Sequence, residues 1–300
     1  MPSRRVAAPV VGLLVVALLA VGTYFGAWRG GGGNPGYMAV VEGCGILTMR
    51  SDNTDWRFNC LNEIWAAVSV SGDGKTIAWD TGKSGSSINV ANADLSNPRV
   101  PVLPAGANVE PTLSPDGRKL AFLHSPRDDG RYDAWVVSVS ADDAEQLSAK
   151  RNVSSVTWSP AGDWIAYVTG WSEETLAGDI VLIHPNGTGD RKLVRGDAPA
   201  WAPDGSRLAF VRGNAVWTIN TDGTGERLLV KYAHAPAWSR DGRILAFMRE
   251  DRCAKAVCPE HIFFMEAGGG AAKLVGPQFP ETRRLLWVTS KSVSKPPPSK

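Results

Sequence analysis

The sequence predicts an all-β fold in which six similar sheet units follow one another and close into a ring. The stretch PAWAPDGSRLAF, at 199–210, returns almost unchanged as PAWSRDGRILAF at 236–247. Asp-Gly or related turns recur along the chain, and one unit is divided between its two ends. Repetition with a period of some tens of residues is typical of stacked or circular repeat architectures.

The composition is that of a globular chain with a sizeable core. Of the 300 residues, 43% are hydrophobic and 21% are charged, while 32 Gly and 20 Pro indicate many turns. This length fits a single all-β domain. The formal net charge is only +2, from 32 basic and 30 acidic residues, which gives no strong field for a polyanion. We therefore expect no nucleic-acid partner.

The N-terminus carries a hydrophobic segment that is separate from the repeats. After Arg4 and Arg5, residues 6–28 contain no charge and are long enough to cross a hydrocarbon core of ~30 Å. The two arginines favour a cytoplasmic N-terminus and an extracytoplasmic remainder. We expect residues 1–28 to be an uncleaved membrane anchor. A signal peptide cleaved near Ala20–Gly22 and a buried core helix are the alternatives, and the Gly-rich residues 29–36 are typical of a flexible linker.

The first half of each unit is predicted to be a strand, a tight turn and a second strand. Each turn is followed by an apolar run with a central alanine, such as IAW at 77–79 or LAF at 208–210. Asp-Gly supplies the positive φ angles that short hairpins require. The turns end at Gly74, Gly117, Gly162, Gly205 and Gly242. The alanines, which we expect to pack closely between sheets, are Ala39, Ala78, Ala121, Ala166, Ala209 and Ala246.

The second half of each unit is an apolar run, a polar turn and another apolar run. AVWTINTDGTGERLLV and DIVLIHPNGTGDRKLV are clear copies, and SINVANADLSNPRVPV and AWVVSVSADDAEQL are looser ones. IFFMEAGGGAAKLV and GILTMRSDNTDWRF bring the copies to six, so the sequence predicts six units of four short strands.

One unit is split between the termini. MAVVE, at 38–42, has no first strand before it, and RLLWV at 284–288 supplies one, with Trp287 in the place of Trp158, Trp201 and Trp238. A ring uses such a split, because the last strand completes the first sheet and removes its open edge. We predict a six-bladed β-propeller over 37–293, closed by this C-terminal strand, with a disordered tail at 294–300. We expect the tryptophans to fill space between sheets rather than stack on a ligand.

The repeat resembles that of the TolB-like β-propellers. APAWAPDGSRLAF and TINTDGTGERLLV are close to the family's repeat, and the resemblance covers about residues 36–293. It implies a six-bladed propeller and a role in protein–protein binding. TolB has an α/β domain ahead of its propeller, whereas here only residues 29–36 separate the hydrophobic segment from the first strand. Similar propellers precede the catalytic domain of prolyl-oligopeptidase-type hydrolases, but after Val293 this chain offers only a short tail.

Binding residues are expected on the loops that vary in length between units. Such loops on a rigid scaffold commonly carry recognition, although the alternative is that they are simply solvated. The principal candidates are Arg127, Asp128, Arg131, Tyr132, Trp171, Glu173, Glu174, Tyr232, His234, Arg252 and His261. Asp129, in the same loop as Asp128, is a further candidate.

The four cysteines fit an exported protein with disulfides. We favour bonds between Cys44 and Cys60 and between Cys253 and Cys258, with the two cross pairings as alternatives. A metal site at Cys253, Cys258 and His261 is the weaker interpretation, because the spacing is only loosely like that of zinc motifs.

No catalytic motif is present in the sequence. There is no G-x-S-x-G, Walker or H-E-x-x-H pattern, and adjacent acidic pairs such as Asp142-Asp143 diverge along an extended chain. We expect a non-enzymatic, monomeric binding module of the bacterial cell envelope, without cofactor or metal, whose partner is an envelope protein or a glycan. The alternatives are a lyase- or glycosidase-type propeller enzyme with a site in the central channel and a small-ligand sensor.

Overall fold

Every regular element in the described part of the chain is a β-strand. The computed structural model describes residues 37–42, 45–50, 57–60, 67–80, 87–93, 96–127, 129–141, 143–148, 152–172, 174–175, 177–250, 260–279 and 284–288. For residues 37–42, 45–50, 57–60, 250, 260, 276–279 and 284–288, only the backbone is described. All of these residues belong to one unit, Pro35–Lys300. The predicted anchor, linker and tail lie outside the described residues.

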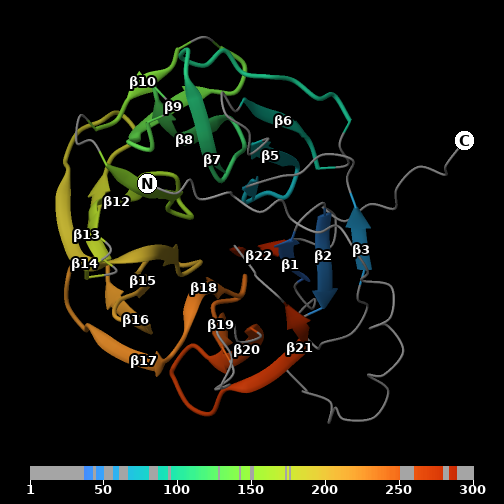
Figure 1. Cartoon of the computed structure of the whole chain (residues 1–300), viewed down its shortest axis with the longest axis vertical. Helices are drawn as coiled ribbons and strands as arrows, with labels where there is room; N and C mark the ends of the chain where they lie inside the picture. The colour runs from blue at the N-terminus through green and yellow to red at the C-terminus, as the bar shows by residue number, and fades with distance from the viewer. Residues whose placement is uncertain are drawn as a thin grey trace, which may run out of the picture. The chain divides into compact units, whose positions relative to one another are not determined.

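The strands form sheets that succeed one another along the chain (Figure 1). The first sheet has the order β22-β1-β2-β3, formed by Arg284–Val288, Tyr37–Glu42, Gly45–Arg50 and Arg57–Cys60. The second is β4-β5-β6, formed by Val68–Val70, Thr76–Asp80 and Ile88–Asn92. The third is β10-β9-β8-β7, in which β7 to β10 are Ala107–Leu113, Lys119–Ser125, Asp133–Ser138 and Glu145–Gln146.

The remaining strands form a seven-stranded and a four-stranded sheet. The seven-stranded sheet runs from β11 to β17: Val153–Trp158, Ile165–Ser172, Ala177–Ile183, Arg191–Trp201, Arg207–Val211, Ala215–Asn220 and Arg227–Lys231. The last sheet runs from β18 to β21: His234–Trp238, Ile244–Glu250, Glu260–Glu266 and Lys273–Phe279. Among the described residues, no helix is long and apolar enough to span a membrane.

The seven-stranded sheet consists of two hairpin groups that share β14. The first half of β14 pairs with β13, from Arg191 to Gly196, and the second half pairs with β15, from Asp197 to Trp201. The change of partner coincides with a register shift and a positive φ of 46° at Ala198. The last strand of one repeat therefore continues directly into the first strand of the next.

The strand near the C-terminus pairs with the first strand of the chain. In the antiparallel β1–β22 ladder, Tyr37 lies opposite Val288 and Val41 lies opposite Arg284. β22 also contacts β18, the first strand of the preceding sheet in the chain.

The sheet β4-β5-β6 lacks a fourth strand, which differs from the predicted strand–turn–strand pattern. Among the described residues, Arg99 forms a β-bridge with β6 through reciprocal backbone hydrogen bonds of 2.8 Å with Val90, and the backbone N–H of Asn92 donates to the carbonyl of Ser96 at 3.0 Å. Pro98 and Pro101 flank this bridge at distances of one and two residues and have no N–H group to extend a ladder. The segment that follows β6 therefore forms one β-bridge in place of a strand, and its residues Val100 and Val102 remain 58% and 63% exposed.

The core consists of apolar layers between successive sheets. Ala78, Ala121, Ala166, Ala209 and Ala246 are all 0% exposed, as expected for close-packing positions. The next residue on each strand is a large aromatic, and four of these, Phe122, Tyr167, Phe210 and Phe247, are also fully buried. Trp158, Trp201 and Trp238 are between 6% and 9% exposed, so they pack between sheets as predicted. Nothing is described of the side chain of Trp287.

The Asp-Gly turns have the predicted left-handed glycine and are also held by side-chain hydrogen bonds. Gly117 has a φ of 69°, which a residue with a Cβ adopts at a cost. The hydroxyl of Ser114 donates to Asp116 at 2.6 Å and accepts the backbone N–H of Lys119 at 2.9 Å. Ser71 with Asp73 and Ser239 with Asp241 repeat the same arrangement.

Candidate functional site

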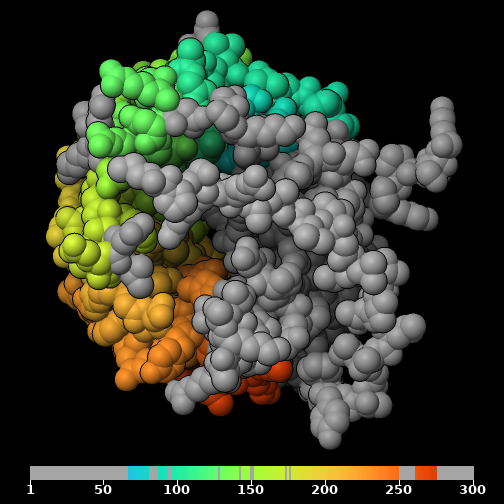
Figure 2. Space-filling view, in the orientation of Figure 1, coloured from blue at the N-terminus to red at the C-terminus, as the bar shows by residue number. Residues whose placement is uncertain are grey.

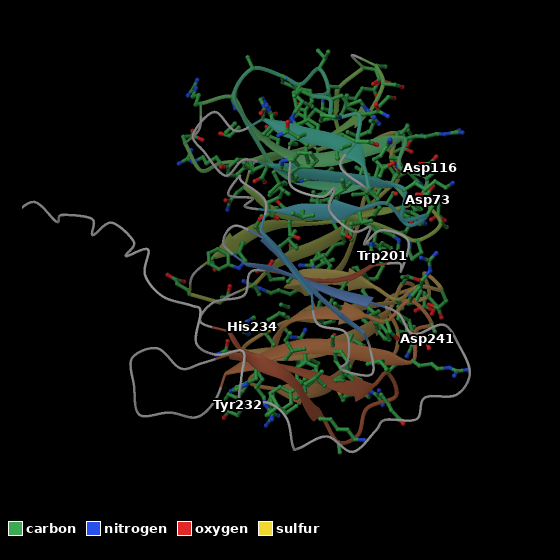
Figure 3. All side chains as sticks on the ribbon, turned by 90° about the vertical axis from the view of Figure 1, so that its right-hand side faces the viewer. Asp73, Asp116, Trp201, Tyr232, His234 and Asp241 are labelled. Atoms are coloured by element: carbon green, nitrogen blue, oxygen red, sulfur yellow. The ribbon has the colours of Figure 1, made fainter. Side chains whose placement is uncertain are left out.

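The strand directions define two faces that matter for the site. The turn face carries the Asp-Gly turns that join the first and second strands of each repeat. The loop face, at the other end of these strands, carries the described connecting residues 126–127, 129–132, 212–214 and 232–233. Figure 3 shows Asp73, Asp116 and Asp241 on one side of the unit and Tyr232 with His234 on the other.

A cavity of about 1200 Å³ runs between the two faces along the first strands of successive repeats. Its walls come from β4, β7, β11, β14 and β18. Towards the turn face it is lined by Pro115, Pro160, Pro203 and Arg240. Towards the loop face it is lined by polar and aromatic side chains, which makes that end the chemically distinctive one.

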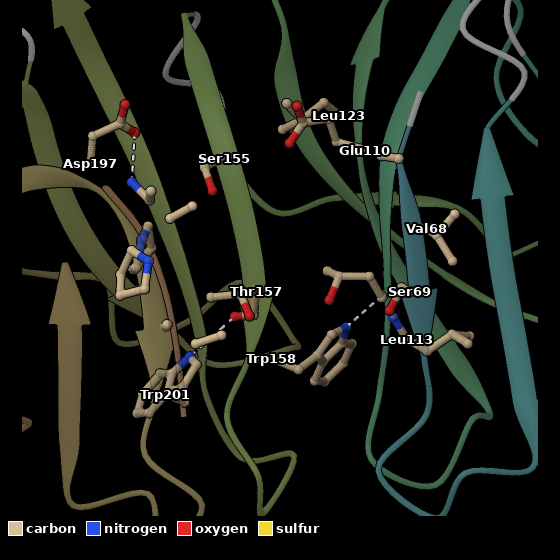
Figure 4. A pocket seen from close by; sticks show the side chains of 18 of the residues that line it. Val68, Ser69, Glu110, Leu113, Leu123, Ser155, Thr157, Trp158, Asp197 and Trp201 are labelled. Atoms are coloured by element: carbon tan, nitrogen blue, oxygen red, sulfur yellow. Dashed lines mark hydrogen bonds between the residues drawn. The ribbon is translucent and has the colours of Figure 1, made fainter. Parts of the chain in front are cut away.

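Three carboxylic acids line the loop-face end. Asp80 ends β5, Glu110 lies on β7 and Asp197 lies on β14. In Figure 4, Asp197 and Glu110 lie on opposite walls of the pocket, at the end away from Trp158 and Trp201. Asp80 is 0% exposed, and its Oδ2 accepts the backbone N–H of Glu110 at 2.7 Å.

Bulges in the first strands position these groups. Glu110, Ala198 and Ala235 have φ values of 53°, 46° and 48°, and each immediately precedes a proline. Register shifts occur in the strand pairings of β7, β14 and β18 across these residues. Positive φ at a residue other than glycine costs roughly 1–3 kcal/mol and is common at functional sites. The bulges thus interrupt the regular strand pairing in three walls of the cavity.

The environment of Asp197 makes its carboxyl group a weaker acid than an exposed aspartate. Burial raises the pKa of the Asp197 carboxyl above its ordinary value, and this effect exceeds that of the two hydrogen bonds that stabilise the charged form. Those bonds come from the backbone N–H of Ala198, at 2.8 Å, and from the side chain of Trp171. Asp197 thus links an inner strand to Trp171 in the long β12–β13 hairpin.

The cavity brings together three of the residues that the sequence singled out. Tyr132, Trp171 and His234 line it and come from three separate repeats. Other candidates lie on the surface, away from the lining: Arg127, Asp129, Arg131 and Glu174 are exposed, and Tyr232 is 60% exposed with a φ of 58°.

His261 differs from the expectation that it would be an exposed loop residue. It lies within β20 opposite Arg249 of β19 and is only 8% exposed, because the strand begins earlier than the sequence pattern indicated. Asp128, Glu173, Arg252, Cys44, Cys253 and Cys258 lie outside the described residues, and of Cys60 only the backbone is described. The disulfide pairings and the weaker metal interpretation at Cys253 and Cys258 therefore stay predictions.

Sequence reasoning missed Asp80, Glu110 and Asp197. Asp80 had a usable signal: it follows IAW at a position where the other described repeats have Leu123, Val168, Val211 or Met248. Glu110 precedes a proline as Ala198 and Ala235 do, but an acidic residue before proline does not by itself indicate a bulge. Within the described ranges, no three His, Cys, Asp or Glu side chains are placed to hold a metal ion.

Comparison with solved structures defines the fold class. TolB from Acinetobacter baumannii superposes with a TM-score of 0.69 at 15% identity, over 84% of this chain and 66% of that one. A propeller in the crystal structure of a nidogen/laminin complex gives 0.65 at 13% identity, over 85% of this chain and 99% of that one. An oligogalacturonate lyase in complex with manganese gives 0.55 at 13% identity, over 77% and 73% of the two chains.

Relationships at the level of sequence are weaker. No family profile matches the chain. The uncharacterized protein YidR of Escherichia coli K12 is 26% identical over 114 residues, which is 36% of this chain and 26% of YidR. The chain therefore spans about a quarter of that relative and just under two thirds of the Acinetobacter TolB. These comparisons place the fold among the β-propellers, and the chain has the fold of a TolB-like β-propeller.

Proposed function

We propose that this chain is a non-enzymatic, extracytoplasmic six-bladed β-propeller that binds an envelope protein or glycan through its loop face. The observation that carries the proposal is the cavity end lined by Tyr132, Trp171 and His234. Aromatic side chains held by a rigid scaffold are favoured in protein–protein contacts, since they lose little conformational freedom on binding. The fold shared with TolB and with the propeller of the nidogen/laminin complex supports a binding role.

The ring closed by the C-terminal strand is part of this proposal. The β1–β22 pairing and the division of the seven-stranded sheet at Ala198 support six blades. We expect a chain truncated after residue 283 to lose cooperative unfolding, because the first sheet then has an open edge. Retention of a single sharp transition in the truncated chain would contradict closure.

Export is supported by the uncharged residues 6–28 behind Arg4 and Arg5. The proposal expects the chain in the membrane fraction of a bacterial host, with the C-terminal region accessible to protease added outside the cytoplasmic membrane. N-terminal sequencing distinguishes an anchor from a cleaved signal peptide. Protection from the protease in intact spheroplasts would place the propeller in the cytoplasm and contradict the proposal.

Capture of the partner tests the binding surface. We propose in-cell crosslinking with the full chain and with Tyr132→Ala or Trp171→Ala, using Arg118→Ala as a control because its side chain is 86% exposed near the turn face. The loop-face variants are expected to lose the crosslinked species and the control to retain it. Loss in the control alone would place the binding surface on the other face. Thermal unfolding shows whether each variant is folded.

A propeller enzyme is the second candidate. The structural neighbour described as an oligogalacturonate lyase, and the raised pKa of Asp197 inside a cavity, are the observations in its favour. We propose an assay of the purified full chain on oligogalacturonate with and without added Mn²⁺. If the chain does not turn over oligogalacturonate, whether or not it binds it, the result agrees with the non-enzymatic binding function. Turnover that Asp197→Asn abolishes would favour the enzyme.

A further inference from the structure

We infer that the loop-face end of the cavity accepts a lysine or arginine side chain from an extended segment of the partner. This inference rests on the proposed binding function and names the partner's chemistry. It depends on the charges that line the cavity, on an unpaired hydroxyl in its wall and on the cavity's length.

Apart from His234, the ionisable groups that the described lining places at this end are acids. Asp80, Glu110 and Asp197 line it, and no lysine or arginine does so among the described residues. Two basic residues are in the described lining: His234 is at the loop-face end, and Arg240 is at the turn face, where it follows Ser239 in the β18–β19 turn. A cleft that holds carboxylates between low-dielectric walls concentrates a negative potential at its opening.

The carboxyl groups are positioned to act on an entering group. Glu110 and Asp197 lie on opposite walls of the cavity (Figure 4), so a cation between them interacts with both. Asp197 is desolvated enough that burial raises its pKa, and a cation nearby would favour its charged form. Trp171 and Tyr132 line the same end, and an ammonium or guanidinium group is attracted to aromatic faces.

A chain segment fits the cavity better than a small ion. The three carboxyl groups come from three different strands, β5, β7 and β14, and the cavity continues past them to the turn face. The hydroxyl of Ser154 is buried and has no hydrogen-bond partner within the described residues, and Ser154 lines the same cavity. An unpaired buried hydroxyl is costly, and an entering peptide backbone supplies a partner for it. A long basic side chain reaches the carboxylates from a backbone held at the opening.

The test uses three fluorescein-labelled peptides that differ only in the central residue: Gly-Ser-Trp-Lys-Trp-Ser-Gly and its norleucine and glutamate counterparts. Norleucine keeps most of the lysine stem without the charge. Anisotropy with the full chain in detergent is expected to give at least about tenfold tighter binding of the lysine peptide than of the norleucine peptide. The preference is expected to weaken as salt is raised.

Charge-removing variants locate the effect. Glu110→Gln and Asp197→Asn are each expected to remove most of the lysine preference. Glu145→Gln is the matched control, because Glu145 is exposed on the outer strand β10, and it is expected to leave the preference unchanged. Thermal unfolding confirms that the variants are folded.

Each contrary outcome is informative. Equal affinity for the three peptides, with competition against the crosslinked partner, would overturn the charge preference and leave the loop-face binding function standing. A preference that survives in both Glu110→Gln and Asp197→Asn would also overturn it. If none of the three peptides binds, the inference is wrong. The proposed binding function is tested separately, by partner capture with the Tyr132→Ala and Trp171→Ala variants.

Discussion

The indole Nε1 of Trp158 donates a hydrogen bond of 3.1 Å to the backbone carbonyl of Thr112 in the neighbouring sheet. Trp238 does the same to Ala200 at 3.1 Å, and Trp201 to Thr157 at 3.4 Å. These tryptophans occupy the same position in successive first strands, so each strand is joined to the one before it. Directional bonds, as well as apolar packing, therefore set the spacing of the sheets.

Replacing Trp158 by phenylalanine tests the value of this bond. Trp158→Phe keeps an aromatic ring but leaves the buried carbonyl of Thr112 without its indole donor, which we expect to cost about 1–2 kcal/mol of unfolding free energy. Urea denaturation measures the loss. Trp201→Phe should cost less, because its bond is longer; an equal or larger loss at Trp201 would show that ring volume dominates.

Asp197→Asn is expected to stabilise the protein at neutral pH. Because burial raises the folded-state pKa of Asp197, the folded state binds the proton more tightly than the unfolded state does. The wild type therefore loses stability as pH rises through this raised pKa, whereas the asparagine variant does not. The gain in melting temperature should be largest at pH 7 and shrink as the pH falls to the ordinary value of 3.8. A gain that is independent of pH would contradict this account.

The strain at the cavity bulges is measurable with glycine. Ala198 has a φ of 46°, which glycine adopts without penalty, so Ala198→Gly is expected to raise the unfolding free energy by up to about 1 kcal/mol. Ala200, two residues along the same strand, is the matched control. Ala200→Gly should lower it by roughly 0.5–1 kcal/mol, since glycine in an ordinary strand only adds unfolded-state freedom. Equal losses at both positions would show that the bulge carries no strain.

Gly196 is required by a close approach rather than by its backbone angle. A Cβ at this position would lie 2.4 Å from Cδ2 of Phe210, which is fully buried. Gly196→Ala should therefore cost about 1–3 kcal/mol through overpacking. Gly268→Ala is the control, because no atom lies within 4 Å of its added Cβ. Thermal unfolding of the two variants side by side is the measurement, and equal melting temperatures would contradict the contact.

The sequence was most informative about what repeats. The turns at Gly117 and Gly205, the buried alanines such as Ala166 and the packing role of Trp238 all followed from aligning the units. Each of these positions meets the same physical demand in every sheet, so its residue type recurs. The fold class could be predicted for that reason.

The candidate site could be predicted only in part. Tyr132, Trp171 and His234 were found because the sequence predicted loops of variable length there, although the structure places Trp171 in β12 and His234 at the start of β18. The carboxyl groups of Glu110 and Asp197 lie at bulges that no periodic pattern indicates. Beside β6 the expected outer strand is reduced to a bridge between Val90 and Arg99, and the sequence pattern did not indicate this. A feature that occurs in only one repeat cannot be predicted by comparing the repeats with one another.

The continuity of β14 has a mechanical consequence. Because one unbroken strand serves two hairpin groups, separating either group strains the backbone of the other, and residues 153–231 are expected to open together as one cooperative block. The sheet that ends at β6, tied on its outer side by one bridge at Val90, has no such coupling. We therefore expect amide hydrogen exchange to be fastest in this sheet.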